Sequence, residues 1–480
     1  MSSDRNGTKD SLASFASLDS LQAMKPDRRD VLRGGLGVSA WLCSAGRRRA
    51  APSGRPNLLV ICSDQQHFQA AGHVDPFFAT PALDRLASDA LRFELAFCSS
   101  PQCSPSRSSM LTGLYPHKTG MMNNANQQGS SFSMSTVGSM LRAAGYHTGY
   151  FGKWHLGGDP APKQGWEELA LEVKDGAVTK RGIEFLRARA AGETPFALFL
   201  MYLDPHEVTG FEPGKTALGG LDVPLDRSFA EERFENKPIV QKHYMEYDEG
   251  SVVWGEPEGV WKEFRAFYRE CVRAFDEQLG IVLAALGELG LLERTAVFVT
   301  SDHGEMDTHH RLILKGPFLY EHVVRIPLLV RLPESFGGRG PGVEREHAWV
   351  NVDLTPTLLE LAGAEARACD GRSALPLLRG AAGFEPRKSV VAEYYGKNRW
   401  IAPIRMLRTE RYKYNLYREF GEELYDLERD PLELENLAAQ ESAAAVKAGL
   451  RAELERWMKE NADPFDTFEV SRLRTPAGRR

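Results

Sequence analysis

The chain has 480 residues, of which 42% are hydrophobic and 26% are charged, an ordinary composition for a soluble globular protein. Disordered and fibrous classes are thereby excluded, and the length suffices for a large domain with a smaller one. The formal net charge of −6 excludes the long-range attraction on which nucleic-acid-binding proteins rely, so any anion site must be local. The six cysteines are too few and too scattered for a disulfide framework or a zinc site.

Residues 1–50 are typical of a targeting segment rather than of a folded part of the protein. Two arginines, Arg28 and Arg29, precede a weakly apolar run from Gly34 to Gly46. This pattern resembles a twin-arginine export signal and predicts a periplasmic or extracellular protein. The run is too short and too rich in glycine to cross a membrane, so no stable membrane insertion is predicted. The alternative is a disordered basic tail.

Three uninterrupted apolar runs have the length of strands, and polar residues follow each of them. Asp64 and Gln65 lie just after the run 57–62, His206 lies just after 195–203, and Asp302 and His303 lie just after 295–300. Such runs indicate strands buried on both faces, as in a parallel sheet, and open α/β sheets place their sites at the carboxyl ends of these strands. A further strand is predicted at 325–330, and helices are predicted at 81–91, 135–144, 264–292 and 355–363.

The stretch from Cys103 to Gly113 places a thiol just before a predicted helix. Pro105 suits a first helical turn because it has no amide hydrogen to lose, and Ser104 is the candidate N-cap. Cys103 then lies at the positive end of the helix, where the pKa of a thiol falls and sulfate or phosphate oxygens bind. Arg107 adds a cation one turn further along. The alternative is a structural cysteine, bridged to the nearby Cys98.

A second polar block reads Gly-Lys-Trp-His, from Gly152 to His155. Lys153 and His155 are two residues apart, so in an extended segment their side chains project to the same face. Either residue alone would more often be a solvated side chain. Together with the Cys103 stretch, they become candidate site residues.

Two later stretches depart from the α/β pattern. Between His206 and about Trp261 the chain is rich in Pro, Gly and charged residues, which predicts long loops that either contact substrate or cover the core. After about Gly383 short apolar segments alternate with polar turns. They predict antiparallel strands at 406–409, 412–417 and 423–427, followed by a helix at 442–459.

The sequence Cys-Ser-Pro-Ser-Arg from Cys103 to Arg107, the Leu-Thr-Gly ending at Gly113, and the Gly-Lys-Trp-His block resemble the type I sulfatases of the alkaline phosphatase superfamily. Leu114 stands where that family often has arginine. The resemblance implies an α/β/α sandwich with a mostly parallel central sheet, and a small C-terminal α+β subdomain with an antiparallel sheet. It places the catalytic domain at residues 55–383 and the subdomain at 384–480.

The resemblance also implies the composition of the site. In that family the cysteine is oxidised to Cα-formylglycine by a formylglycine-generating enzyme, and the hydrate of this aldehyde is the nucleophile. A divalent cation, usually Ca²⁺ and otherwise Mg²⁺ or Mn²⁺, binds beside it. The implied metal ligands are Asp64, Gln65, the modified Cys103, Asp302 and His303. The implied catalytic residues are Cys103, Arg107, Lys153, His155, His206 and Lys315.

Each of these residues has an implied role in hydrolysing a sulfate monoester. His206, with Lys315, protonates the leaving alcohol, and His155 takes the proton whose loss releases sulfate. Lys153 and Arg107 hold the hydrate and the charged oxygens. Gln65 and His303 replace the Asp and Asn that are commoner in the family.

Two alternatives remain for the function. Phosphonate monoester hydrolases and phosphodiesterases of the same superfamily use the same aldehyde and also pair Asp with Gln at the first strand, so Gln65 favours them, whereas Ser106 favours a sulfatase. A non-catalytic binding protein would result if Cys103 stayed a thiol. The predicted substrate is a small-molecule or saccharide sulfate ester: a sulfated sugar, a sulfated aromatic compound and choline sulfate all fit.

Overall fold

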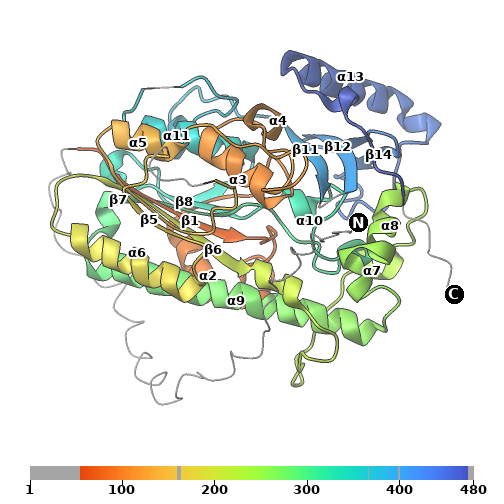
Figure 1. The fold of residues 1–480 in the computed structure, drawn as a ribbon, viewed down its shortest axis with the longest axis horizontal. Helices are drawn as coiled ribbons and strands as arrows, with labels where there is room; N and C mark the ends of the chain where they lie inside the picture. The colour runs from red at the N-terminus through yellow and green to blue at the C-terminus, as the bar shows by residue number, and fades with distance from the viewer. Residues whose placement is uncertain (1–53, 159–163, 366, 398–399, 474–480) are drawn as a thin grey trace, which may run out of the picture. The chain divides into compact units, whose positions relative to one another are not determined.

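The computed structural model describes residues 54–158, 164–365, 367–397 and 400–473, so the predicted targeting segment lies outside the described residues. Its centre is an eight-stranded sheet with the order β5-β4-β6-β1-β7-β8-β2-β9 (Figure 1). The strands run parallel to their neighbours except β8, which is antiparallel to both β7 and β2. Their bounds are β1 Asn57–Asp64, β2 Leu91–Phe93, β4 His147–Gly152, β5 Glu168–Leu171, β6 Phe196–Pro205, β7 Thr295–Ser301, β8 Leu328–Arg331 and β9 Gly342–Glu344.

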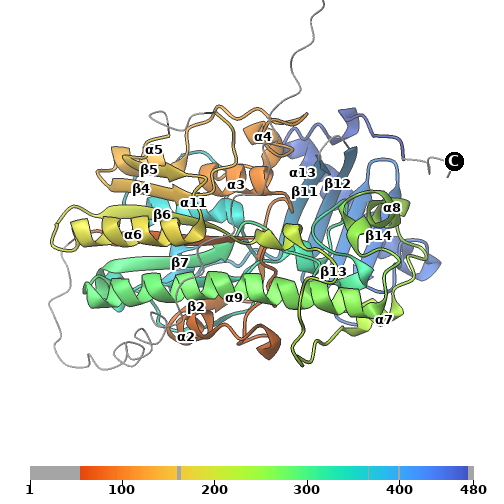
Figure 2. The same cartoon turned by 60° about the horizontal axis from the view of Figure 1, so that its bottom comes forward.

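Helices cover both faces of this sheet, because its central strands are apolar on both sides. Leu58 and Val60 of β1 belong to one core and Leu59 and Ile61 to the other. One layer of helices contains α6 and α9, which run side by side, together with α2 (Figure 2). The other layer contains α3, α5 and α11. The bounds are α2 Pro81–Asp89, α3 Cys103–Thr112, α5 Val137–Ala143, α6 Asp175–Arg189, α9 Glu258–Glu288 and α11 Leu354–Leu361.

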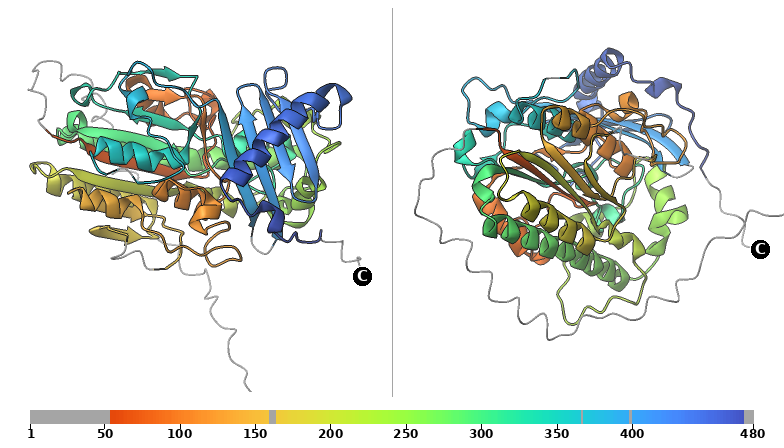
Figure 3. Two further views of the ribbon diagram at one scale, coloured as in Figure 1. Left: turned by 90° about the horizontal axis from the view of Figure 1, so that it is seen from above. Right: turned by 60° about the vertical axis from the view of Figure 1, so that its left-hand side comes forward.

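Near the C-terminus of the described chain, a four-stranded antiparallel sheet is covered by one long helix (Figure 3). Leu450, Leu454 and Met458 of α13 pack against this sheet. The bounds are β11 Ser389–Lys397, β12 Trp400–Thr409, β13 Tyr412–Tyr417, β14 Gly421–Asp426 and α13 Ala444–Glu460. The predicted fold class is thus confirmed, although the first of these strands, β11, was not predicted.

The stretch from His206 to Trp261 is more ordered than its composition predicts. It contains two helices, α7 (Arg227–Glu231) and α8 (Ile239–Tyr247), where only loops were predicted. Polar contacts to other parts of the protein hold both helices in place. Next to α7, Asp226 accepts a hydrogen bond from His309 at 2.7 Å, and in α8 the amide of Gln241 donates to Glu423 of β14 at 2.7 Å.

The remaining short elements complete the connections between these layers. They are β3 Ala96–Phe97, paired with β10 Trp349–Val350, and the helices α4 Pro116–Thr119, α10 Glu321–Val324 and α12 Leu375–Leu378. Within the described ranges, no helix combines the length and apolar character that crossing a membrane requires.

Buried charge pairs join the four-stranded sheet to the rest of the protein. His117 in α4 bonds Glu393 of β11 at 2.7 Å, and Lys413 of β13 reaches Glu321 in α10 at 3.2 Å. His117 and Glu393 also lie near Asp463 in a geometry that would suit a metal ion. The guanidinium of Arg405 also pairs with Asp463 at 2.6 Å.

Candidate active site

The candidate site lies at the carboxyl edge of the central sheet, where β1 and β7 end side by side. The two strands pair in parallel with Ser63 opposite Ser301, so Asp64 and Asp302 leave the sheet at the same edge. The amide of Asp302 donates to the carbonyl of Ser63 at 3.2 Å, and both carboxylates are fully buried. The two predicted acids therefore lie together, as expected for an open α/β sheet.

Gln65 turns the chain away from the end of β1 in a left-handed conformation. Its φ of 70° is unfavourable for a residue other than glycine, and such conformations concentrate at functional sites. The carboxylate of Asp302 stabilises the turn, because its Oδ1 accepts the backbone N–H of Gln65 at 3.1 Å. The side-chain amide of Gln65 contacts two further buried groups, Glu305 and Lys315.

Cys103 is the first residue of α3, two positions deeper in the helix than the sequence predicts. Gln102, not Ser104, occupies the N-cap. The Ser104 hydroxyl makes tertiary contacts instead, because it donates to the carbonyl of His155 and accepts the N–H of Ala125 at 3.0 Å. The predicted placement of Cys103 at the positive end of the helix still holds.

The thiol of Cys103 lies within a cluster of charged and polar groups. Its Sγ is 3.2 Å from Nε2 of His303, 3.7 Å from Nζ of Lys153 and 3.8 Å from Oδ1 of Asp64. Burial alone would raise the pKa of this thiol, but Lys153, with Lys315 and His303, holds the pKa well below its usual value. Burial raises the pKa of the Cys98 thiol instead. Cys98 and Cys103 are both free, so the alternative of a bridge between them is wrong.

Arg107 is fully buried, and each of its guanidinium nitrogens has a protein partner. Nε donates to Asp302 at 2.8 Å, Nη2 to Asp64 at 3.1 Å, and Nη1 to the carbonyl of Lys153 at 2.8 Å. Arg107 therefore fixes the two carboxylates and partly neutralises their charge. Any contribution of Arg107 to binding an anion would include the electrostatic field of its charge.

Lys153 and His155 reach the site from the segment that follows β4. Gly152 ends that strand with a φ of 110°, and a Cβ there would lie 1.9 Å from the carbonyl oxygen of Met201. His155 also has a positive φ, 55°, so the segment is not extended as predicted. The Lys153 ammonium nevertheless lies 2.5 Å from Asp64, and Nδ1 of His155 is buried with no hydrogen-bond partner among the described residues.

His206 and Lys315 supply the remaining predicted groups. His206 directly follows β6, and burial, reinforced by the Lys315 cation, lowers its pKa to about 4. The Lys315 ammonium is buried and donates to the side-chain oxygen of Gln65. Its carbonyl accepts from Lys397 of β11 at 2.8 Å, so the four-stranded sheet also contacts the site.

The residues at this edge fit a divalent cation. Asp64, Cys103, Asp302 and His303 each offer one ligand atom, and these atoms all lie within 4.8 Å of one another. All four residues are fully buried, so a bound cation would be shielded from water. Carboxylate oxygens with one imidazole suit Ca²⁺, Mg²⁺ or Mn²⁺, and a formylglycine hydrate at position 103 would replace the thiol with oxygen.

Several residues of the site were not predicted from the sequence. Glu305 bonds Gln65, Glu172 accepts the backbone N–H groups of Trp154 and His155, and Lys397 contacts Lys315. Glu305 could have been identified as a site residue from the sequence, because only one residue separates it from His303, which follows Asp302 directly. Glu172 and Lys397 could not have been identified in this way, since both are distant in sequence from every motif named above.

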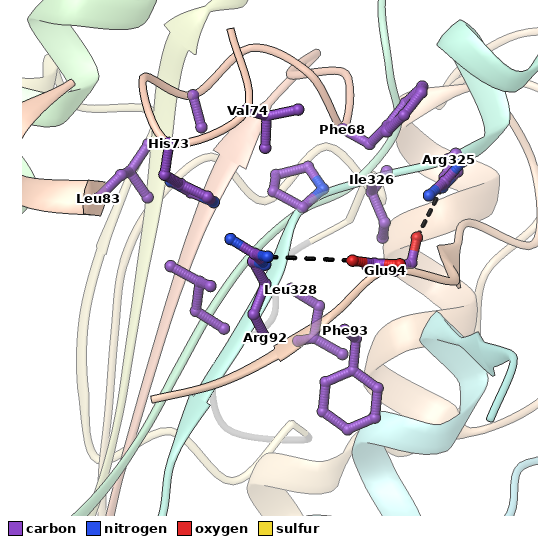
Figure 4. Close-up of a pocket in the computed structure, with 13 residues that line it drawn as sticks. Phe68, His73, Val74, Leu83, Arg92, Phe93, Glu94, Arg325, Ile326 and Leu328 are labelled. Carbon is purple, nitrogen blue, oxygen red and sulfur yellow. Dashed lines mark hydrogen bonds and ion pairs between the residues drawn. The ribbon is translucent and has the colours of Figure 1, made fainter. Parts of the chain in front are cut away.

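A separate pocket of about 350 Å³ lies elsewhere on the main part of the protein (Figure 4). Arg92 and Glu94 of the β2 region and Arg325, which precedes β8, line it together with apolar side chains. Its charged groups are already paired, since Arg325 donates to the carbonyl of Glu94 at 2.7 Å and Arg92 lies 3.9 Å from the Glu94 carboxylate. This pocket therefore does not contain the chemical groups of the candidate site.

Comparisons with known proteins point to one family. A family model described as Sulfatase matches residues 56–364, and one described as N-sulphoglucosamine sulphohydrolase, C-terminal, matches residues 309–460. The uncharacterized sulfatase YidJ of Escherichia coli is 28% identical, over 87% of this chain and 90% of its own. The Delta 4,5-hexuronate-2-O-sulfatase of Bacteroides thetaiotaomicron is 27% identical, over 89% of this chain and 93% of its own.

Among solved structures, a 2-O GAG sulfatase superposes with a TM-score of 0.78 at 24% identity, covering 87% of this chain and 95% of that one. This likeness supports the fold, and the match of the Sulfatase family model to most of the chain shows the family. The chain therefore belongs to the sulfatase family of enzymes, the sulfuric ester hydrolases.

Proposed function

We propose that the protein hydrolyses sulfate monoesters of a saccharide, with formylglycine at position 103 and a divalent cation, most simply Ca²⁺, beside it. The observation that carries the proposal is the buried cluster in which Cys103 lies among the carboxylates of Asp64 and Asp302, His303 and the Lys153 cation. A saccharide is favoured because relatives of the chain are named for uronate and N-acetylglucosamine sulfates. Export by the twin-arginine route is part of the proposal and rests on Arg28 and Arg29.

The two added groups have distinct tasks. A formylglycine hydrate supplies a nucleophilic hydroxyl and a second hydroxyl whose deprotonation allows sulfate to leave, and a divalent cation supplies Lewis acidity. Asp64, Gln65, Asp302 and His303 would hold the cation. Lys153 and Lys315 are the cations placed to hold the charged oxygens of the ester.

His155 and His206 are assigned the two proton transfers. His155 suits the role of base, because its buried Nδ1 lacks a partner among the described residues. His206 has a pKa of about 4 and is therefore neutral at pH 7 before substrate arrives. An anionic sulfate bound nearby would raise that pKa and favour the protonated form that donates to the leaving alcohol. Lys315 is the second candidate donor.

The modification is tested by producing the chain with and without a formylglycine-generating enzyme. Mass spectrometry of the peptide from Pro101 to Arg107 gives the fraction of Cys103 converted, and kcat is measured on a panel of sulfated saccharides, aryl sulfates and choline sulfate. We expect kcat per mole of protein to rise in proportion to the converted fraction, with a saccharide as the best substrate. Full activity in a sample whose Cys103 is entirely thiol would rule out the proposed nucleophile.

A further inference from the structure

The side-chain amide of Gln65 lies between two groups that fix which way it points. Its Nε2 donates to Oε2 of Glu305 at 2.5 Å, and its Oε1 accepts from the ammonium of Lys315. Both carboxylate oxygens of Glu305 already accept hydrogen bonds from N–H groups, and an ammonium only donates them. Rotating the amide by half a turn would set NH₂ against NH₃⁺ and an oxygen against a carboxylate. The arrangement therefore allows one orientation.

Glu305 is itself fixed by the backbone around it. Its Oε1 accepts the N–H of Asp307 at 3.2 Å and also that of Leu314, which leaves Oε2 facing Gln65. Its own N–H donates to the carbonyl of His322 at 3.0 Å. Gly304 permits this close approach, because a Cβ there would lie 2.0 Å from the same carbonyl oxygen. The side chain is fully buried, so water does not compete for these bonds.

We propose that Glu305 is a positioning residue, which selects the orientation of Gln65 in which the amide oxygen, and not the NH₂ group, faces Lys315 and the cation site. The inference rests on the proposed function, because it gives Gln65 an oxygen to offer to a divalent cation. It explains how an amide can serve where the family more often has a carboxylate. A carboxylate presents oxygen in either orientation, whereas an amide requires a neighbour that only accepts hydrogen bonds.

The geometry predicts an unusual consequence for the near-isosteric variant Glu305→Gln. The two backbone N–H groups at Oε1 would hold the new amide oxygen on their side, so the new NH₂ would face Gln65. Two donors would then oppose each other, and turning Gln65 would only set its NH₂ against the Lys315 ammonium, so neither orientation of the Gln65 amide would be satisfied. The amide oxygen of Gln65 would then no longer be fixed at the cation site, although no side chain would change size.

The test is calorimetric titration of Ca²⁺ into chelator-treated, formylglycine-containing protein. We expect Glu305→Gln to weaken Ca²⁺ binding by about 10- to 100-fold, the range for losing an outer partner of a metal ligand. Adding Gln65→Glu should restore the wild-type affinity to within about threefold, because the introduced carboxylate would accept from the new NH₂ and still face the cation with an oxygen. In the wild-type background, Gln65→Glu should raise the Ca²⁺ affinity less than it does in the Glu305→Gln background. The reason is that Gln65→Glu alone sets two carboxylates, those of residues 65 and 305, against each other.

Glu423→Gln is the matched control, because Glu423 is also fully buried and also accepts from a glutamine amide, that of Gln241 at 2.7 Å. It should leave Ca²⁺ affinity unchanged. If Glu305→Gln binds Ca²⁺ as wild type does, or if Gln65→Glu changes affinity equally in both backgrounds, the inference is overturned while the proposed function stands. If the wild-type protein binds no Ca²⁺, the proposed metal site and this inference fail together.

Discussion

Replacing Cys103 by alanine is expected to lower kcat by about 10⁴-fold or more, because removing a nucleophile leaves only the binding and electrostatic parts of catalysis. The fold should tolerate the change, since the thiol contacts the polar groups of His303, Lys153 and Asp64 and does not belong to the apolar core. We therefore expect the variant to melt close to the wild-type temperature and to retain affinity for the sulfated substrate. Steady-state kinetics and thermal melts measure the two effects.

Cys98→Ala is the matched control for this prediction. Cys98 is a buried thiol in the preceding segment, and its Sγ contacts the carbonyl of Val323 at 3.6 Å instead of the charged cluster. Replacing Cys98 by alanine removes a small buried group, which should lower the free energy of unfolding and leave kcat unchanged. Comparable activity losses in Cys98→Ala and Cys103→Ala would show that the effect is structural and would remove Cys103 from the reaction.

Asp302→Asn is expected to have the second-largest effect, on both metal binding and turnover. The substitution keeps the size of the side chain and removes the charge that faces Arg107 and the proposed cation. We expect Ca²⁺ affinity to fall beyond the ~10- to 100-fold that loss of an outer partner costs, and kcat/KM to fall with it. Stability should also drop, by about 3 kcal/mol, because the buried Arg107 loses one of its two carboxylate partners.

Asp353→Asn separates these two effects. Asp353 is equally buried and pairs with the guanidinium of Arg387, with Nη2 at 2.7 Å, away from the site. Its replacement should cost a similar amount of stability while Ca²⁺ affinity stays the same. Calorimetry and melting curves on both variants provide the comparison. Wild-type turnover in Asp302→Asn after exhaustive chelation would argue against a metal-dependent site.

The sequence predicts those parts of the site that depend on patterns of neighbouring residues. Asp64 and Asp302 follow long apolar runs, and burial of such runs in a parallel sheet brings their carboxyl ends together whatever the loops between them do. Cys103 was placed near a helix start for a similar local reason, because Pro105 suits a first helical turn. These features depend on residues that are close together in the chain.

The features that were not predicted depend on tertiary contacts. Ser104 is a good N-cap residue, but its hydroxyl bonds the carbonyl of His155, which no local rule could indicate. The helices α7 and α8 form in a polar stretch because His309 and Glu423 bind residues at that stretch. In the same way, no local pattern indicates that Asp302 is fully buried and accepts hydrogen bonds from Gln65, His303 and Arg107.

The charge of the site bears on its choice of substrate. Gln65 and His303 leave two carboxylates, Asp64 and Asp302, among the proposed metal ligands, with the ammonium groups of Lys153 and Lys315 close by. Repulsion of an anionic ester is weaker in such a site than in one with more carboxylates. Sulfate and phosphonate monoesters, which are both monoanions, should therefore both enter. Discrimination between the two esters then depends on how strongly the site binds the transition state of each reaction.

The most direct test of the central claim compares these two esters with one leaving group. We predict that kcat/KM for an aryl sulfate exceeds that for the matching aryl phosphonate, measured on enzyme of known formylglycine content, with measurable phosphonate hydrolysis beside it. A phosphonate preference of more than about tenfold, equal to ~1.4 kcal/mol in transition-state binding, would contradict sulfate ester hydrolysis as the main activity of this site.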